Sequence, residues 1–127
     1  MNALYRMYVD CRRNGCLEGI FIADKEDVEF LVKNKVQVYF GEVLGKHSEI
    51  SGSIEEKEIE MITDDENVLS VIKKYGLETG FSPFDYSVPS SYGEENQLPE
   101  DCMVEDAIEI LRSRLEKIQW FIYFYFM

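Results

Sequence analysis

The segment from Asp101 to the C-terminus carries the most regular hydrophobic pattern in the chain. Its apolar residues recur at alternating steps of four and three, which is the spacing of a heptad seam. The seam residues are Val104, Ile108, Leu111, Leu115, Ile118, Ile122 and Tyr125. The spacing predicts a helix from about Asp101 onward, on the order of 40 Å long at 1.5 Å per residue. A helix of that length strongly limits how a chain of 127 residues can fold.

Residues 120–127, WFIYFYFM, are apolar or aromatic on every side of such a helix. A helix of this kind has to be buried all round or covered by a partner. A terminal strand is the alternative, because aromatic and β-branched residues also favour strands. If the segment is helical, its cover is either the chain's own core or a second copy of the chain, and both interpretations stay open. The candidate homodimer contact consists of Leu111, Leu115, Ile118, Ile122 and Tyr125.

A membrane-surface role for the same segment is disfavoured. Helices that lie in the membrane interface carry a basic face opposite their apolar face, and this stretch has none. No run of the sequence reaches the roughly 20 apolar residues that a spanning helix needs. We therefore expect no membrane span.

Composition limits the class of protein. The chain has 127 residues, of which 46% are hydrophobic, and this suits one domain with a core of its own. Its 25 acidic and 13 basic residues give a net charge of −12. This charge argues against nucleic-acid binding, because phosphate contacts need Lys and Arg. A protein partner is compatible with it, and a basic partner in particular.

The cysteines and the N-terminus indicate the compartment. Cys11, Cys16 and Cys102 are an odd set, which is typical of free thiols in a reducing environment. Residues 1–13 lack the long apolar core of a signal peptide. We expect a cytoplasmic protein. A zinc site is not expected, because Cys11 and Cys16 have no second pair of ligands.

Four segments have the composition of strands. Residues 4–9 and 17–23 flank Asn14-Gly15, which is a strong hairpin signal. Residues 35–40 and 57–62 alternate between apolar and polar side chains, with Ile59 and Met61 expected to face inward. Ile50 and Ile54 are in phase in a further short strand. Short turns between consecutive strands favour an antiparallel meander.

Two short helices complete the predicted domain. Asp24 can cap the first helix, whose apolar stripe is Val28, Leu31 and Val32. A capping-box sequence from Thr63 to Glu66 predicts the start of the second helix. The second helix is expected to end at Gly76 and to bury the face formed by Val68, Leu69, Val71, Ile72 and Tyr75. The fold class is therefore α+β: an antiparallel sheet of about five strands, two short helices and a long C-terminal helix.

A proline-containing segment follows the second helix. All three prolines of the chain lie between residues 79 and 101, which is typical of a linker or loop. Phe81, Phe84 and Tyr86 are unusual in a free linker, so residues 81–86 are expected to pack back on the domain or to bind a partner. The expected organisation is an α+β domain over residues 1–86, a linker or loop over 87–100, and a helical segment over 101–127.

Residues 41–49, GEVLGKHSE, resemble a phosphate loop only superficially. A P-loop has four residues between its glycines and Ser or Thr directly after Lys, whereas His47 follows Lys46 here. His47, Ser48 and Glu49 do not form a triad by adjacency, because neighbours in a strand point to opposite faces. We expect neither an enzyme nor a cofactor.

The same loop is a candidate recognition site, because polar loops held by a rigid sheet are common binding sites. The candidate binding residues are Tyr39, Phe40, Glu42, Lys46, His47, Glu49, Phe81, Phe84 and Tyr86. The run YFGEVLGKHSE at 39–49, the Thr63-Asp64-Asp65 capping site and SPFDY at 82–86 resemble small uncharacterised proteins from bacteria and their phages. The resemblance covers roughly residues 4–86. It implies a bacterial or phage origin and transfers no catalytic residue.

The predicted function is that of a non-enzymatic interaction protein that forms oligomers through its C-terminal segment. With a phage-like origin, its charge suggests an acidic inhibitor or decoy of a host protein. The alternative is a small-ligand-binding module that uses residues 40–49 and the aromatic residues of 81–86.

Overall fold

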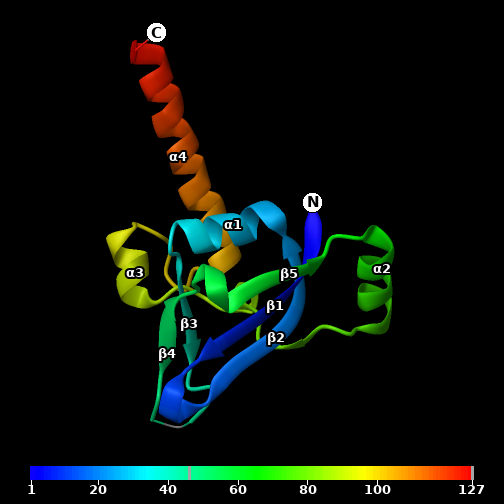
Figure 1. The fold of residues 1–127 in the computed structure, drawn as a ribbon. Helices are drawn as coiled ribbons and strands as arrows, with labels where there is room; N and C mark the ends of the chain where they lie inside the picture. The colour runs from blue at the N-terminus through cyan, green and yellow to red at the C-terminus, as the bar shows by residue number, and fades with distance from the viewer. Residues whose placement is uncertain (46, 127) are drawn as a thin grey trace.

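The computed structural model describes residues 1–45 and 47–126, which form an α+β fold (Figure 1). The strands are β1 (Asn2–Asp10), β2 (Cys16–Asp24), β3 (Gln37–Gly41), β4 (Ile50–Ser53), β5 (Ile59–Thr63) and β6 (Thr79–Gly80). The helices are α1 (Lys25–Lys33), α2 (Glu66–Tyr75), α3 (Ser90–Glu95) and α4 (Val104–Phe126). The predicted fold class is confirmed, and the C-terminal segment is a helix, not a strand.

The hairpin of β1 and β2 is the centre of the main sheet. The two strands pair antiparallel from Asn2 opposite Asp24 to Asp10 opposite Cys16. Their connection is a 3₁₀ turn, Arg12–Asn14, so the hairpin predicted from Asn14-Gly15 forms with a loop longer than two residues. β5 pairs with the free edge of β1 and β6 with that of β2, which gives the strand order β5-β1-β2-β6.

The expected meander is wrong. β3 and β4 form a separate two-stranded antiparallel sheet, and β5 returns to pair with β1. The reason is α1, which follows β2 directly and carries the chain off the sheet before β3 begins. Met61 was expected to face inward but is half exposed, because β5 is an edge strand of which only Ile59 packs against the core.

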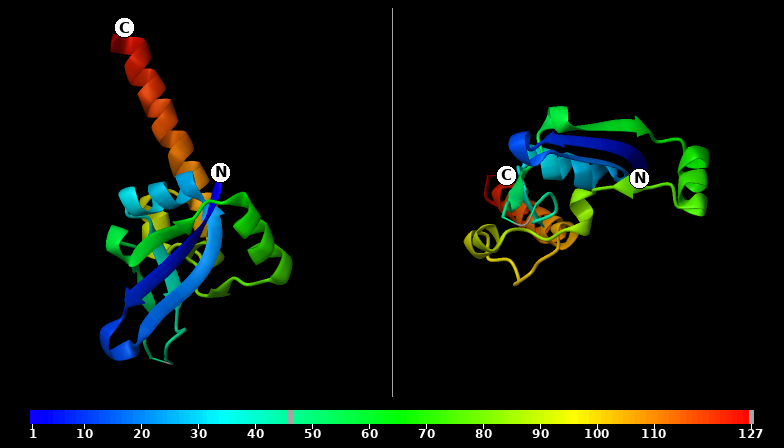
Figure 2. Two further views of the ribbon diagram at one scale, coloured as in Figure 1. Left: turned by 45° about the vertical axis from the view of Figure 1, so that its right-hand side comes forward. Right: turned by 90° about the horizontal axis from the view of Figure 1, so that it is seen from below.

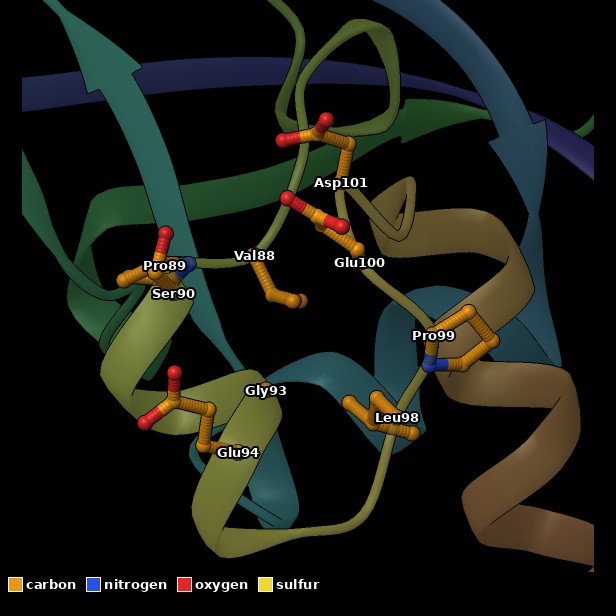
Figure 3. A pocket seen from close by; sticks show the side chains of 9 residues that line it. All are labelled: Val88, Pro89, Ser90, Gly93, Glu94, Leu98, Pro99, Glu100 and Asp101. Atoms are coloured by element: carbon orange, nitrogen blue, oxygen red, sulfur yellow. The ribbon is translucent and has the colours of Figure 1, made fainter.

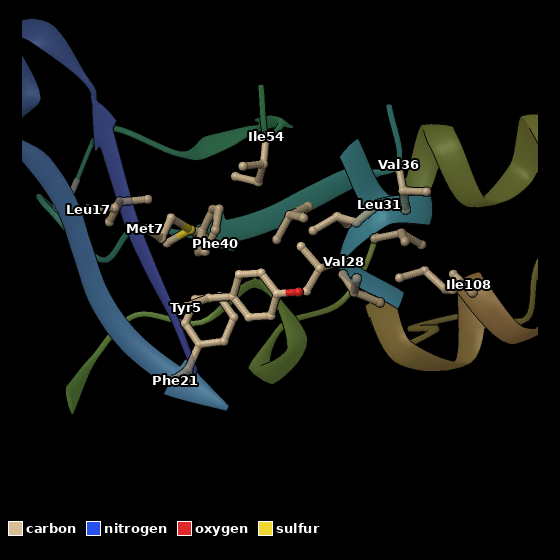
Figure 4. Packing of buried hydrophobic residues seen from close by; sticks show 14 of the residues in the cluster. Tyr5, Met7, Leu17, Phe21, Val28, Leu31, Val36, Phe40, Ile54 and Ile108 are labelled. Carbon is tan, nitrogen blue, oxygen red and sulfur yellow. The ribbon is translucent and has the colours of Figure 1, made fainter. Parts of the chain in front are cut away.

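The hydrophobic core joins the main sheet to both α1 and α4. Its side chains run from Leu17 and Met7 on the sheet, past Phe40 and Val28, to Ile108 on α4 (Figure 4). The alternation predicted for residues 35–40 is confirmed. Its inward residues are fully or almost fully buried, as are those of the α1 stripe that face the same core. These residues are Val36, Val38, Phe40, Val28 and Leu31.

Helix α2 differs from its prediction at its start and on its face. Asp65, not Thr63, caps the helix, accepting a hydrogen bond from the Asn67 amide at 2.8 Å. The helix lies to one side of the sheet, away from α1 and α4 (Figures 1 and 2). For that reason Leu69 is the only residue of α2 that is buried, and Val71 and Tyr75 are exposed. The predicted end at Gly76 is confirmed, in a left-handed cap.

The segment between β6 and α4 packs against the rest of the domain. Phe81, Phe84 and Tyr86 are partly buried against the core. Ser87 forms isolated bridges with Tyr39 of β3 and with Met103, and Val88 is buried. The chain then forms α3 and reaches α4, so these contacts place the start of α4 against the sheet.

Gly19 lies where the backbone at Phe81 approaches β2 closely, and so it gives a direct test of the β2–β6 pairing. A Cβ atom at Gly19 would lie 1.9 Å from the carbonyl oxygen of Phe81, which is backbone and cannot rotate away. We expect Gly19→Ala to lower the free energy of unfolding by about 3 kcal/mol. Gly45→Ala is the control, with no described atom near its added methyl, and should change it by less than about 1 kcal/mol. Urea denaturation followed by circular dichroism measures both, and equal effects would contradict the pairing.

Asp24 makes stability depend on acid pH. A hydrogen bond from the Met1 ammonium group at 3.1 Å, with one from the Glu26 amide at 2.9 Å, holds the pKa of Asp24 below its usual value. A lowered folded pKa means that the stabilisation is present above the ordinary value of 3.8 and is lost as the pH falls through the folded value. Asp24→Asn keeps the cap but not the charge. It should cost about 0.3 to 1 kcal/mol at neutral pH, and the cost should shrink as the pH falls below 3.8. Urea denaturation measures the difference in free energy of unfolding between the variant and the unchanged chain. The same difference at neutral pH and well below pH 3.8 would refute this account.

Candidate interaction site

The base of α4 is fixed in the core. Val104, Ala107 and Ile108 are completely buried, and they face α1 and the segment that precedes α4. Apolar burial of this kind contributes about 25 cal/mol per Å² of surface removed from water. The first turns of α4 are thus an integral part of the domain.

Two arginines hold the next turn. Arg112 donates to Glu26 at 2.8 Å and to Asp27 at 3.0 Å, both on α1. Burial raises the pKa of Asp27, and the Arg112 guanidinium opposes that rise. Arg114 donates to the carbonyl of Gln97 at 2.8 Å and to that of Asn96, beyond the end of α3. These contacts link α4 to α1 and to the segment directly after α3, and they fix the direction in which α4 leaves the body.

Beyond these contacts α4 projects away from the rest of the molecule (Figures 1 and 2). From Leu115 to Phe126 each residue of the helix is exposed, and Phe126 reaches 85%. We call residues 118–126 the α4 tip. The tip has no charged side chain, since Lys117 is the last one in the sequence. An exposed apolar surface of this extent is unusual for a monomer, which makes the tip a candidate interaction site.

The aromatic rings of the tip pack along the helix. Trp120 stacks on Phe124 with ring centroids 5.5 Å apart, and Phe121 contacts Tyr125 at 4.4 Å. Residues four apart on a helix lie one above the other, so each pair forms a stripe along α4. The two stripes are neighbours, and Phe124 joins them through its contact with Tyr125 at 5.7 Å. The tip therefore presents ordered aromatic surfaces and not single scattered residues.

The structure places the predicted oligomer residues on this helix. Leu111 is partly buried against the core, whereas Leu115, Ile118, Ile122 and Tyr125 are exposed. The alternative that the chain's own core covers the whole seam does not hold for these four residues. What the sequence did not reveal is that the body stops covering α4 after Arg114.

The predicted loop residues are divided between core and surface. Phe40 is buried, with its ring 4.8 Å from that of Tyr86, and Phe84 packs against Phe21 at 6.1 Å. The neighbouring Glu49 raises the pKa of Tyr39, so these two candidate residues lie close to each other. Glu42, His47 and Glu49 are exposed, Phe81 is partly buried, and Lys46 lies outside the described residues.

The clefts lie away from these loop residues. One cleft of about 350 Å³ lies beside α3 and is lined by Val88, Leu98, Glu100 and Asp101 among others (Figure 3). Another, of about 500 Å³, lies on the outer face of the main sheet beside Arg6, Ile20 and Ile62. Neither is lined by residues 39–45 or 47–49. Within residues 1–45 and 47–126 no cluster of His, Cys, Asp or Glu side chains has the arrangement of a metal site.

Comparison with known proteins adds no family to these observations. The chain matches no model of a protein family, and no match was found among curated proteins or among solved structures. The likeness to small bacterial and phage proteins thus stays a prediction. Among the described residues, no helix combines the length and the apolar character that a membrane crossing requires.

Two isoleucines on α4 test the distinction between base and tip. Ile108 is fully buried and Ile118 is 54% exposed, although both belong to the same heptad seam. Ile108→Ala should lower the free energy of unfolding by about 2 to 5 kcal/mol, because it leaves a cavity. Ile118→Ala, measured at concentrations where the chain is monomeric, should change it by less than about 0.5 kcal/mol. Urea denaturation followed by far-UV circular dichroism compares them, and a large loss for Ile118→Ala would show that the tip is packed on the body.

Proposed function

We propose that this chain is a non-enzymatic interaction protein that assembles with a second copy through the exposed seam of α4. The observation that carries the proposal is that α4 leaves the body and exposes an apolar surface along its whole outer half. The contact residues are Leu111, Leu115, Ile118, Ile122 and Tyr125.

A second copy is the partner that the seam spacing favours. Residues at alternating steps of four and three keep one stripe of a helix in contact with a like helix, by knobs-into-holes packing. Residues 111–125 span about 21 Å at 1.5 Å per residue, which is enough for four turns of contact. In a dimer with a two-fold axis, each copy contributes the same stripe to the contact. Two-fold symmetry is the commonest symmetry of soluble oligomers.

The acidic body sets the conditions for this association. Two copies with a net charge of −12 each repel one another at low ionic strength. Salt screens that repulsion and leaves the apolar contact intact, so self-association should become stronger as salt is added. A contact held by ion pairs would respond in the opposite way.

The charge also supports a basic protein as a further partner. An acidic surface attracts a basic one over a distance and speeds the encounter. With the bacterial or phage origin that the sequence suggests, this partner would be a host protein that the chain inhibits or imitates as a decoy. A pull-down from bacterial lysate at low and high salt tests this hypothesis. The absence of a specific partner at both salt concentrations would refute it.

The ligand-binding alternative is less well supported. It needs the aromatic side chains of residues 40, 84 and 86 to line a cavity, whereas these rings pack against one another and against Phe21. We therefore rank it below the interaction protein.

Charged substitutions in the seam test the self-association. Ile118→Asp with Ile122→Asp places two carboxylates at the centre of the contact, and should reduce the mass to that of one chain, 14.9 kDa, at every concentration. The unchanged chain should have a larger mass that rises with concentration and with salt. Sedimentation equilibrium measures both.

The matched control is Val71→Asp with Tyr75→Asp on α2. These residues are about as exposed as the two isoleucines, but they lie on another part of the surface (Figure 1). The control should associate like the unchanged chain. If the unchanged chain is a monomer throughout, or if the seam variant keeps its mass, the seam is not the contact.

A further inference from the structure

The main sheet ends in β5, and no other described strand pairs with the outer edge of that strand. In the view from below, β5 lies along the border of the molecule beside β1, with no described element beyond it (Figure 2). Met61 and Ile62 of β5 are about half exposed, and Glu60 is exposed as well. An open edge of this kind is a template for a further strand, because its outward backbone N–H and C=O groups have no strand to bond to.

The register shows which backbone groups point to this open edge. The groups of successive residues in a strand turn to opposite edges. Hydrogen bonds at both ends of the β1–β2 hairpin show that the odd-numbered residues of β1 face β2, so Arg6 faces β5. Glu60 lies opposite Arg6, and therefore the groups of Ile59 and Met61 point outward. The register shift in β5 comes after Met61, so residues 59–61 form a regular stretch of edge.

The side chains of this stretch define what an added strand has to offer. Ile59 and Met61 lie opposite Met7 and Tyr5, whose side chains belong to the core, so both are on the core side of the sheet. Glu60 comes between them and is on the solvent side. Side chains directly opposite each other on neighbouring strands interact. The complementary segment is therefore apolar opposite Ile59 and Met61 and basic opposite Glu60.

The charge around β5 selects the partner. Residues 55–66 contain seven acidic residues and one basic residue, which gives −6 of the net charge of −12. Glu60 forms no ion pair among the described residues, because Arg6, which lies opposite it, is instead 3.9 Å from Glu18. A second copy would bring the same acids to this edge, and like charges on facing strands oppose pairing. A basic segment gains from the same charges.

We propose that β5 accepts an extended basic segment of a partner protein as an antiparallel fifth strand of the main sheet. Backbone hydrogen bonds to Ile59 and Met61 supply the pairing, and a lysine or arginine opposite Glu60 supplies the selectivity. The inference rests on the basic partner that the proposed function includes, and it names the contact surface and the conformation of that partner. It is independent of self-association through the α4 seam.

The probe is a fluorescent peptide that alternates valine and lysine over about seven residues, a common strand length. The full chain is titrated into the peptide, and fluorescence anisotropy reports binding. We expect saturable binding that weakens as salt is added, because salt screens the attraction between the charges. A peptide with glutamate in place of lysine should bind at least about tenfold more weakly.

Two N-methylated peptides separate strand addition from attraction by charge alone. One carries methyl groups on its valine amides and the other on its lysine amides, so both keep the same charge and side chains. In an antiparallel pair the valines opposite Ile59 and Met61 turn their amides to β5, and the lysines turn theirs away. The valine-methylated peptide should therefore bind at least about tenfold more weakly, because it lacks the donors, and the lysine-methylated peptide should bind like the unmodified one.

Backbone amides of β5 locate the contact. Hydrogen exchange at Ile59 and Met61, followed by nuclear magnetic resonance, should slow when the valine–lysine peptide is bound. The emission of Trp120, the only tryptophan, should not change, because it lies in the α4 tip. The seam variant Ile118→Asp with Ile122→Asp should bind the peptide like the unchanged chain. This result separates a failure at β5 from a failure of the seam.

Glu60→Lys is the test variant. It reverses the charge at the centre of the edge, so it should bind the lysine peptide at least about tenfold more weakly and the glutamate peptide more tightly than the unchanged chain does. A gain of affinity cannot result from misfolding. Glu95→Lys on α3 is the matched control, because Glu95 is also exposed and the change in net charge is the same. It should bind both peptides like the unchanged chain.

Several results would overturn the proposal. Equal binding of the two methylated peptides would assign the contact to charge and not to strand pairing. Unchanged exchange at Ile59 and Met61, or equal responses of Glu60→Lys and Glu95→Lys, would place the contact away from β5. The absence of saturable binding would remove this edge as a docking site. If the pull-down still recovers a specific basic partner, the proposed function stands and only its assignment to β5 is wrong.

Discussion

The attachment of α4 to α1 is the contact on which the projecting helix depends. Ile108 fills the core beside α1, and one turn further on Arg112 holds two carboxylates of α1. α1 is itself fixed at its start, where Asp24 caps the helix and binds the Met1 ammonium group. A buried apolar contact fixes the position of α4, and a directed ion pair fixes its rotation. Together they set which side of the tip faces which way.

The features that the sequence predicts well are local ones. Alternation along β3 and the apolar stripe of α1 follow from the period of each element, and the caps at Asp24 and Gly76 follow from single residues. Strand pairing is not local in this sense. The alternation of β5 is equally compatible with pairing to β4 or to β1, and the choice depends on where α1 takes the chain. The meander failed for that reason, and with it the inward orientation of Met61.

The same limit applies to the candidate site. Periodicity identifies which residues share a face of a helix, but not what covers that face. The apolar stripes of α2 and α4 look alike in sequence, yet the structure covers only Leu69 of one and the first turns of the other. The aromatic residues at 81, 84 and 86 show the reverse case. They lie in a proline-containing segment that resembles a linker. They are nevertheless partly buried against the core, whose residues on β3 and the main sheet are distant in sequence.

Charge decides which of the two exposed apolar faces is the better interaction site. The α2 face lies beside Asp64, Asp65 and Glu66, so any acidic copy or anionic surface that approaches it meets strong repulsion at close range. Phe126 lies about 21 Å along the helix axis from the Arg112 anchor. The Debye length at physiological ionic strength is about 8 Å, so the charge of the body is largely screened at the end of the tip. Distance along a rigid helix thus allows an acidic protein to present an apolar surface where its own charge no longer opposes contact.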